Sequence, residues 1–236
     1  MTYLLVNLGS ILIPLLFSFE KKLQFYKNWR FLFPAIFITG AFFLVWDYLF
    51  TEWGVWGFNE MHLLGIYLFG LPIEELMFFI CIPYACVFGY EALNYFVKKD
   101  LLGKYSVRIT IFLIAFLGFQ AYLYRGFAYT FATTVLVVLF LILQLFVVKS
   151  KRLGRFYFAY LVLLIPFLVV NGILTGTGIE EEVVWYNNSE NLSVRILTIP
   201  VEDLFYGMLL ILMNLSIYEY LKQRATRGNG GEFKAN

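Results

Sequence analysis

Apolar residues gather into seven long runs along the chain, separated by short polar segments. The runs are Tyr3–Phe19, Phe31–Phe50, Leu71–Val97, Val107–Tyr124, Tyr129–Val148, Phe156–Leu174 and Pro200–Leu221. Each is close to the roughly 20 residues that an α-helix needs to cross a bilayer. The apolar positions within a run are nearly continuous, whereas the strands of a membrane β-barrel would alternate over about 10 residues. The pattern predicts an all-α polytopic membrane protein with seven transmembrane helices.

Composition supports this prediction. Of the 236 residues, 61% are hydrophobic and only 14% are charged, and the mean hydropathy is +0.76. A soluble domain is usually about 45–50% apolar, so this chain has too much apolar surface for a water-facing globule. In lipid, helices satisfy their own backbone groups. We therefore expect a multi-pass protein of the cell membrane.

The basic residues fall almost entirely on one side of the predicted membrane. Of 18 Lys and Arg residues, only Arg125 and Arg195 lie in connections that face the other side. Cytoplasmic loops carry the excess of Lys and Arg in membrane proteins. The count predicts an extracytoplasmic N-terminus and a cytoplasmic C-terminus, and it places most of the acidic residues toward the extracytoplasmic side.

Two of the predicted helices begin with the same acidic motif. Pro72-Ile73-Glu74-Glu75-Leu76 opens the third run and Pro200-Val201-Glu202-Asp203-Leu204 opens the seventh, 128 residues further on. Acidic residues within membrane segments are costly and usually functional. The repetition makes N-terminal capping of a single helix a less satisfactory interpretation than a shared site.

The likeness between the halves extends beyond this motif. Asp47 lies near the end of the second run and Asn171 near the end of the sixth, with similar residues after each, and a Trp-x-x-Asn sequence recurs as Trp56–Asn59 and Trp185–Asn188. We predict two parallel three-helix repeats, at residues 1–100 and 127–222, joined by a spacer transmembrane helix at 101–126. The spacer adds a crossing, which gives both units one orientation. A disordered cytoplasmic tail is expected at 223–236.

The acidic pairs suit acid–base chemistry. Adjacent helical residues point about 100° apart, so one acid of each pair should face inward, and we favour Glu74 and Glu202. Two facing carboxyls disfavour double ionisation, which leaves a general acid beside a general base. On this interpretation Glu74→Gln or Glu202→Gln abolishes activity.

The acids are surrounded by aromatic residues. Ring faces attract cations, so the site would suit a carbocation better than an oxyanion, although the same rings are also ordinary core packing. The expected lining residues are Asp47, Asn171, Phe78, Phe79, Phe205 and Tyr206.

Other chemistry has little support in the sequence. His62 is the single histidine, so a site with several histidine ligands for a metal is excluded. Phosphate-binding glycine motifs are missing, which gives no support to nucleotide, NAD or flavin binding. Cys81 and Cys86 are most simply packing residues. No metal, cofactor or nucleic acid is expected.

The paired Pro-[Ile/Val]-Glu-[Glu/Asp]-Leu motifs, the Asp47 and Asn171 helix ends and the three-helix units resemble the membrane-embedded lycopene cyclase domain family. In that family two small units occur as separate subunits or fused in tandem, and here they look fused. The resemblance covers the chain to about Leu221 and carries Glu74, Glu75, Glu202 and Asp203 over as catalytic candidates. Asp203 departs from a strict Glu-Glu pair, so the two units need not be equivalent.

The resemblance implies a lycopene β-cyclase, an isomerase (intramolecular lyase) that needs no cofactor. It would close the linear ends of lycopene into β-rings, giving γ-carotene and then β-carotene in carotenoid biosynthesis. Its partners would be lycopene and other carotenoids dissolved in membrane lipid. Two alternatives stay open: another carotenoid end-group enzyme such as a hydratase, or a small proton-coupled transporter.

Overall fold

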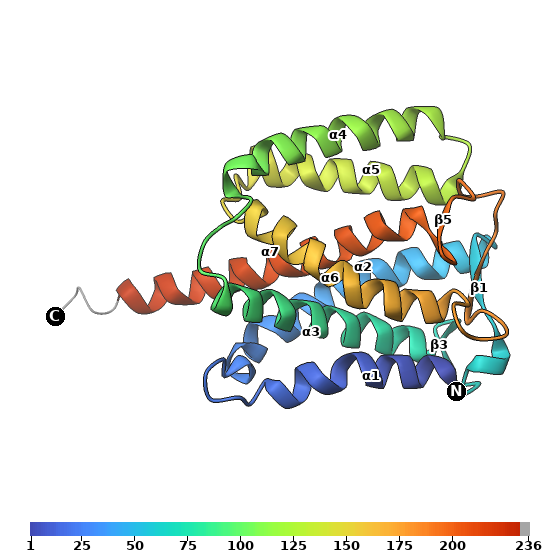
Figure 1. Ribbon diagram of the computed structural model, residues 1–236, viewed down its shortest axis with the longest axis horizontal. Helices are drawn as coiled ribbons and strands as arrows, with labels where there is room; N and C mark the ends of the chain where they lie inside the picture. The colour runs from blue at the N-terminus through green and yellow to red at the C-terminus, as the bar shows by residue number, and fades with distance from the viewer. Residues whose placement is uncertain (232–236) are drawn as a thin grey trace.

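The computed structural model describes residues 1–231 and consists mainly of helices packed side by side (Figure 1). The α-helices are α1 (Thr2–Phe17), α2 (Trp29–Glu52), α3 (Ile73–Phe96), α4 (Ser106–Leu123), α5 (Ala128–Ile142), α6 (Leu153–Leu174) and α7 (Val201–Gly231). A π-helical turn, Leu143–Val147, continues α5. The chain passes back and forth along one direction, so α3 and α7 both start at the end where the strands lie.

Six of the helices in the described part of the chain are long and apolar enough to cross a membrane. They are the ones built on α2, α3, α4, α5, α6 and α7, and they agree with six of the seven predicted runs. The prediction of an all-α membrane protein is therefore confirmed in its main point. The remaining helix, α1, is apolar but has only 16 residues, about 24 Å at 1.5 Å per residue, which is short of a hydrocarbon core of about 30 Å.

The end of the chain differs from the prediction. Residues 223–231, expected to be disordered, continue α7 as helix to Gly231. Lys222, Arg224 and the residues around them are compatible with helix, and the packed part of α7 provides a nucleus from which the helix propagates. The last residues of the predicted tail, 232–236, lie outside the described residues.

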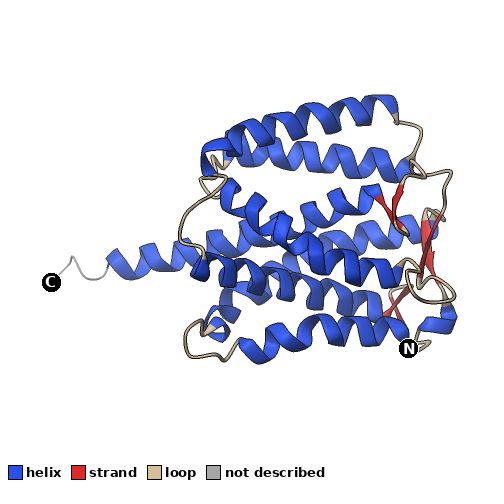
Figure 2. Ribbon diagram, viewed as in Figure 1, coloured by secondary structure: helices blue, strands red, loops and turns tan. Residues whose placement is uncertain are grey.

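Three small two-stranded sheets, which the hydropathy pattern did not predict, lie together at one end of the helices (Figure 2). Strands β2 (Tyr67–Leu68) and β3 (Leu71–Pro72) form a hairpin directly before α3, and β5 (Arg195–Ile196) and β6 (Ile199–Pro200) form its counterpart before α7. Both hairpins turn through residues with positive φ: Phe69 and Gly70 in one, Leu197 in the other.

The third sheet joins the two halves of the chain. Strand β1 (Trp56–Phe58) pairs antiparallel with β4 (Val184–Tyr186), with Gly57 opposite Trp185. The ladder continues at each end, where Asn59 N–H donates to Val183 O and Asn187 N–H donates to Val55 O, both at 2.9 Å. Asn59 and Asn187 thus make the same backbone hydrogen bond in the two halves of the chain. Asn187, not Asn188, is therefore the structural equivalent of Asn59, and the sequence alignment of the Trp-x-x-Asn repeat is displaced by one residue.

The main core lies where α2, α3 and α7 pack against one another. Phe43 and Trp46 of α2 each lie 5.0 Å from Tyr206 of α7, measured between ring centroids, and Phe79 of α3 lies 6.0 Å from Phe43. This aromatic packing fixes the first turns of α3 and α7, and hence the acidic motifs, at the same end of the bundle.

Candidate acidic active site

The two acidic motifs are held by the same local structure. The hairpin before each helix places its backbone over the first turn: Ile73 N–H donates to Ile66 O at 2.9 Å, and Val201 N–H donates to Val194 O at 3.0 Å. The helix then begins after Pro72 or Pro200, where the missing proline N–H is no loss.

Glu74 and Glu202 face these loops. Glu74 Oε1 accepts a hydrogen bond from Leu64 N–H at 2.6 Å, and Glu202 Oε1 accepts one from Leu192 N–H at 2.8 Å, each donor ten residues upstream. Thr130 of α5 also donates to Glu202 Oε1, at 2.6 Å. Both glutamates therefore anchor the loop that precedes their helix, near the positive end of the helix dipole.

Glu75 and Asp203 point into the bundle instead and line one cavity together. The expectation that Glu74 and Glu202 face inward is therefore wrong. Helical spacing required only that one acid of each pair point inward. The loop N–H groups of Leu64 and Leu192 decide which one does, because they bind the first acid of each pair.

A tyrosine holds each of the inward acids. Tyr3, near the start of α1, donates its hydroxyl to Glu75 Oε2. Tyr129, near the start of α5, donates to Asp203 Oδ1 at 2.5 Å. All four side chains are at least 94% buried. Hydrogen bonds to a carboxylate are among the stronger polar contacts in proteins, so these tyrosines fix the position of both acids.

The surroundings of Asp203 supply two further donors. Asn171 Nδ2 donates to Asp203 Oδ2 at 2.7 Å, and the Tyr186 hydroxyl donates to the same oxygen at 3.0 Å. Burial and the neighbouring Asp203 carboxylate raise the pKa of Tyr186 well above its ordinary value, so Tyr186 stays a neutral phenol and a donor. With Tyr129, three donors converge on one carboxylate, which favours its ionised form.

The surroundings of Glu75 are different, because a second carboxyl lies there. Asp47, the counterpart of Asn171, lines the same cavity and is close enough to interact electrostatically with Glu75. Asp47 Oδ1 accepts from Trp56 Nε1 at 2.7 Å, while Oδ2 has no hydrogen-bond partner in the described structure. Two like charges at a buried site disfavour double ionisation, so the second carboxyl makes the Glu75 side of the cavity unlike the Asp203 side.

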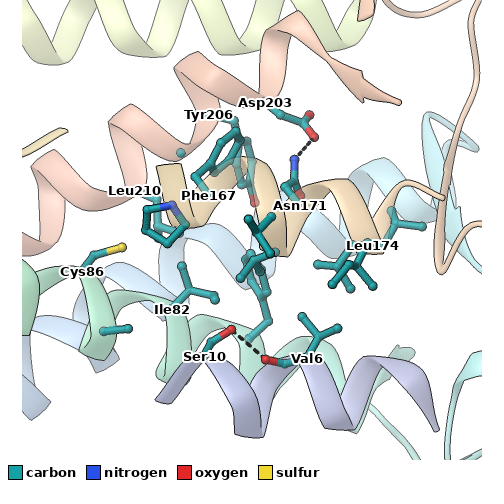
Figure 3. Close-up of a pocket in the computed structure, with 18 of the residues that line it drawn as sticks. Val6, Ser10, Ile82, Cys86, Phe167, Asn171, Leu174, Asp203, Tyr206 and Leu210 are labelled. Carbon is teal, nitrogen blue, oxygen red and sulfur yellow. Dashed lines mark hydrogen bonds between the residues drawn. The ribbon is translucent and has the colours of Figure 1, made fainter. Parts of the chain in front are cut away.

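The cavity that contains these acids has a volume of about 840 Å³ and is lined mainly by apolar side chains of α1, α3, α6 and α7. Figure 3 shows Val6 and Ser10 on one side, facing Asn171, Tyr206 and the Asn171–Asp203 hydrogen bond on the other. Sites for small molecules commonly occupy roughly 300–1,000 Å³ with a few polar groups in an apolar wall. The cavity fits that description.

The predicted lining residues divide between cavity and core. Asp47, Asn171, Phe78 and Tyr206 line the cavity. Phe79 lies in the buried core and Phe205 packs against that core, and neither lines the cavity. The two are therefore packing residues, because helical geometry turns them away from the wall that Phe78 and Tyr206 form.

Sequence reasoning missed the residues that hold the acids. These are Tyr3, Trp56, Tyr129 and Tyr186. The sequence carried a signal for two of them: Tyr3 begins the first predicted apolar run and Tyr129 begins the fifth. Aligning those two runs as repeat equivalents would have paired the tyrosines.

The remaining candidate metal ligands, the cysteines and the single histidine, lie apart from one another. Within residues 1–231, no group of three or more His, Cys, Asp or Glu side chains is arranged to hold a metal ion. Cys86 lines the cavity as a free thiol and Cys81 is buried. His62 Nδ1 is hydrogen-bonded to Thr2 Oγ1 at 2.9 Å, outside the cavity.

These features define a class: a multi-pass helical membrane protein with buried carboxyls around an apolar cavity. The family model described as lycopene cyclase matches residues 1–93 and 126–221. The chain therefore belongs to the lycopene cyclase family, as its motifs predicted, and the family implies an enzyme that cyclises carotenoids. The unmatched residues are 94–125, which include α4, and 222–236. No curated protein and no solved structure matches the chain.

Proposed function

We propose that this protein is a lycopene β-cyclase whose proton-handling groups are Glu75, Asp47 and Asp203. The observation that carries the proposal is the single apolar cavity into which all three carboxyls point from helices of both halves of the chain. Family membership supplies the substrate class, and the cavity supplies groups suited to redox-neutral acid–base chemistry. The reaction would need no cofactor.

The reaction begins with proton addition to the terminal double bond of lycopene, which leaves a tertiary carbocation. The next double bond attacks this cation, forms the ring bond and moves the positive charge to a ring carbon. Loss of a proton from the adjacent ring carbon then forms the ring double bond of the β-end. One proton enters and one leaves, so the substrate and the product are isomers. Closure of one end gives γ-carotene and closure of both gives β-carotene.

The unlike surroundings of the carboxyls suggest how the roles divide. The Asp47–Glu75 pair is the proton donor, because mutual repulsion keeps one proton on the pair. Asp203 is the base, because three hydrogen-bond donors fix its position and stabilise its ionised form. A carbocation is so strong an acid that a weakly basic carboxylate is sufficient to take its proton, and the fixed negative charge also stabilises the cation before deprotonation.

Aromatic side chains on the cavity wall would stabilise the same cation. Trp56, Tyr129, Tyr186 and Tyr206 form one contiguous cluster beside Asp203, with ring centroids 5.1 Å apart for Trp56 and Tyr129 and 5.8 Å apart for Tyr129 and Tyr186. Desolvated ring faces attract a cation by about 2 kcal/mol. The cluster also excludes water, which would otherwise capture the cation as an alcohol.

The fold proposal is two parallel three-helix units, α1–α3 and α5–α7, with α4 as the spacer and α1 as a seventh, short membrane helix. It is supported by contacts that recur in both halves: tyrosine to inward acid, loop N–H to outer acid, and hairpin to first turn. The proposed orientation in the cell membrane, with the N-terminus extracytoplasmic, rests on the distribution of Lys and Arg.

The test compares neighbouring glutamates in a host that accumulates lycopene. Glu75→Gln removes the proton donor and Asp203→Asn removes the base, so we expect each to reduce ring formation at least 100-fold, within the usual range for a general acid or base. Glu74→Gln keeps the acceptor oxygen for Leu64 N–H and should retain activity. Chromatography of the extracted carotenoids gives the readout.

Wild-type amounts of β-carotene from Glu75→Gln would refute the assignment, as would loss of activity in Glu74→Gln alone. Hydroxylated linear carotenoids from the wild-type protein would instead indicate a hydratase. Equal membrane levels of the variants, measured by immunoblot, exclude an effect of folding.

A further inference from the structure

The cavity reaches the lipid-facing surface of the protein between α1 and α6. Gly9 and Ile13 of α1 and Pro166 and Val169 of α6 line the cavity. The same residues are exposed at the outside of the helix bundle: Ile13 is 63% exposed and Val169 is 61% exposed. A residue that is exposed at the surface and also lines a cavity marks an edge of its opening.

The opening is bounded on the other sides. Toward the hairpin end, Tyr3 and Leu174 belong to one buried cluster, against which Val6 and Val170 pack. Toward the opposite end, α3 and α6 pack closely, since a Cβ on Gly89 would lie 2.9 Å from Leu163 Cδ2. The gap therefore lies along the middle of both helices, at the depth of the hydrocarbon core in the proposed orientation.

The opening also lies at a suitable distance from the acids. Gly9 is six residues from Tyr3, which holds Glu75, and six residues of helix rise roughly 9 Å. An extended hydrocarbon that passes between α1 and α6 would therefore bring its end to the acids after a short path. Every side chain at the edge of the opening is apolar, so a lipid-dissolved molecule keeps apolar surroundings along this path.

We propose that this gap, formed by Gly9, Ile13, Pro166 and Val169, is a lateral opening through which a linear carotenoid passes from the bilayer to the acids. The proposal rests on the proposed function for the identity of the substrate. One end of the carotenoid lies in the cavity while the remainder of the molecule stays between the helices and in lipid. The acids of both halves line that one cavity, so lycopene has to leave and re-enter with its other end first before that second end can cyclise.

Gly9 offers a direct test, because a Cβ built there meets no atom within 4 Å. Gly9→Phe thus adds a ring to the opening without a clash at Cβ. Gly118 of α4 is the matched control: it is also within a helix, has equally open space and does not line the cavity. On the facing helix, Val169→Trp is paired with Ile165→Trp, since Ile165 is 69% exposed and does not line the cavity.

Purified variants in liposomes that contain lycopene give the rate of ring formation. We expect Gly9→Phe and Val169→Trp to lower the initial rate at least tenfold and to raise the fraction of γ-carotene among the products. Gly118→Phe and Ile165→Trp should match wild type. Thermal melting in detergent identifies a variant that has failed to fold. If Gly9→Phe fails to fold, the comparison of Val169→Trp with Ile165→Trp tests the opening, and if Val169→Trp fails, the comparison of Gly9→Phe with Gly118→Phe does so.

A second readout separates the opening from catalysis. In an inactive Glu75→Gln background, lycopene uptake is followed through the induced circular dichroism of the bound carotenoid, and Gly9→Phe should slow it at least tenfold. Wild-type uptake or ring formation with both bulky variants would overturn the lateral opening. If Gly9→Phe slows uptake in the Glu75→Gln background while the wild-type protein forms no rings, the opening is supported and the cyclase function is refuted.

Discussion

Removing the Tyr129 hydroxyl should impair the base while leaving the cavity almost unchanged in shape. Tyr129 is the donor to Asp203 Oδ1, at 2.5 Å, whereas Oδ2 has both Asn171 and Tyr186. A hydrogen bond to a charged group contributes about 1.5–3 kcal/mol net. A loss of 1.36 kcal/mol slows a reaction tenfold, so Tyr129→Phe should lower the rate of ring formation roughly 10- to 150-fold.

Two further substitutions make the expectation specific. Tyr186→Phe removes a donor from an oxygen that keeps Asn171, so its effect should be smaller than that of Tyr129→Phe. Tyr218→Phe removes another buried hydroxyl that donates to a carboxyl, Glu91 Oε1 at 2.6 Å, but at the opposite end of α7. It should alter stability without altering the rate per folded molecule.

The assay is the initial rate of ring formation by purified protein in lipid, normalised to the folded fraction. A Tyr129→Phe rate within twofold of wild type would refute the role given to the hydrogen bonds around Asp203. An effect of Tyr218→Phe equal to that of Tyr129→Phe would show that loss of packing, not of the base, explains the result.

Two other predictions follow from the site and the topology. Asp47→Asn removes the second carboxyl beside Glu75, so that the repulsion that holds a proton on the pair is lost and fewer molecules carry a protonated Glu75; we expect ring formation to fall at least tenfold, and an unchanged rate would contradict the shared proton. For orientation, a membrane-impermeant thiol reagent added to intact cells should label Ser189→Cys, in the loop before β5, and not Lys151→Cys, between α5 and α6; the reverse labelling would contradict the proposed topology.

The membrane helices were predictable because their signal is local and strong. Hydropathy over about 20 residues identified six spans whose ends agree with the structure to within a few residues, although the length of α7 was underestimated. The hairpins before α3 and α7 gave no such signal, since two-residue strands are too short for a hydrophobic period to be recognised.

The acidic site was predictable only in outline. Repetition identified the motifs, but the choice between Glu74 and Glu75 depends on Leu64, whose N–H binds Glu74 from ten residues upstream. Likewise, Trp56 and Tyr186 meet only because β1 and β4 pair across the two halves of the chain. Long-range contacts of this kind leave no periodic trace in a single sequence.

In the proposed reaction, protonation by carboxyls inside the membrane starts ring formation. The most direct measurement incubates lycopene with the purified protein in liposomes prepared in heavy water, without added cofactor, followed by mass spectrometry of the products. We expect β-carotene that carries a single deuterium for each ring, at the carbon that received the proton, and no rings from Glu75→Gln. Unchanged lycopene with the wild-type protein, or rings free of deuterium, would show that carboxyls of this protein do not start ring formation by protonation.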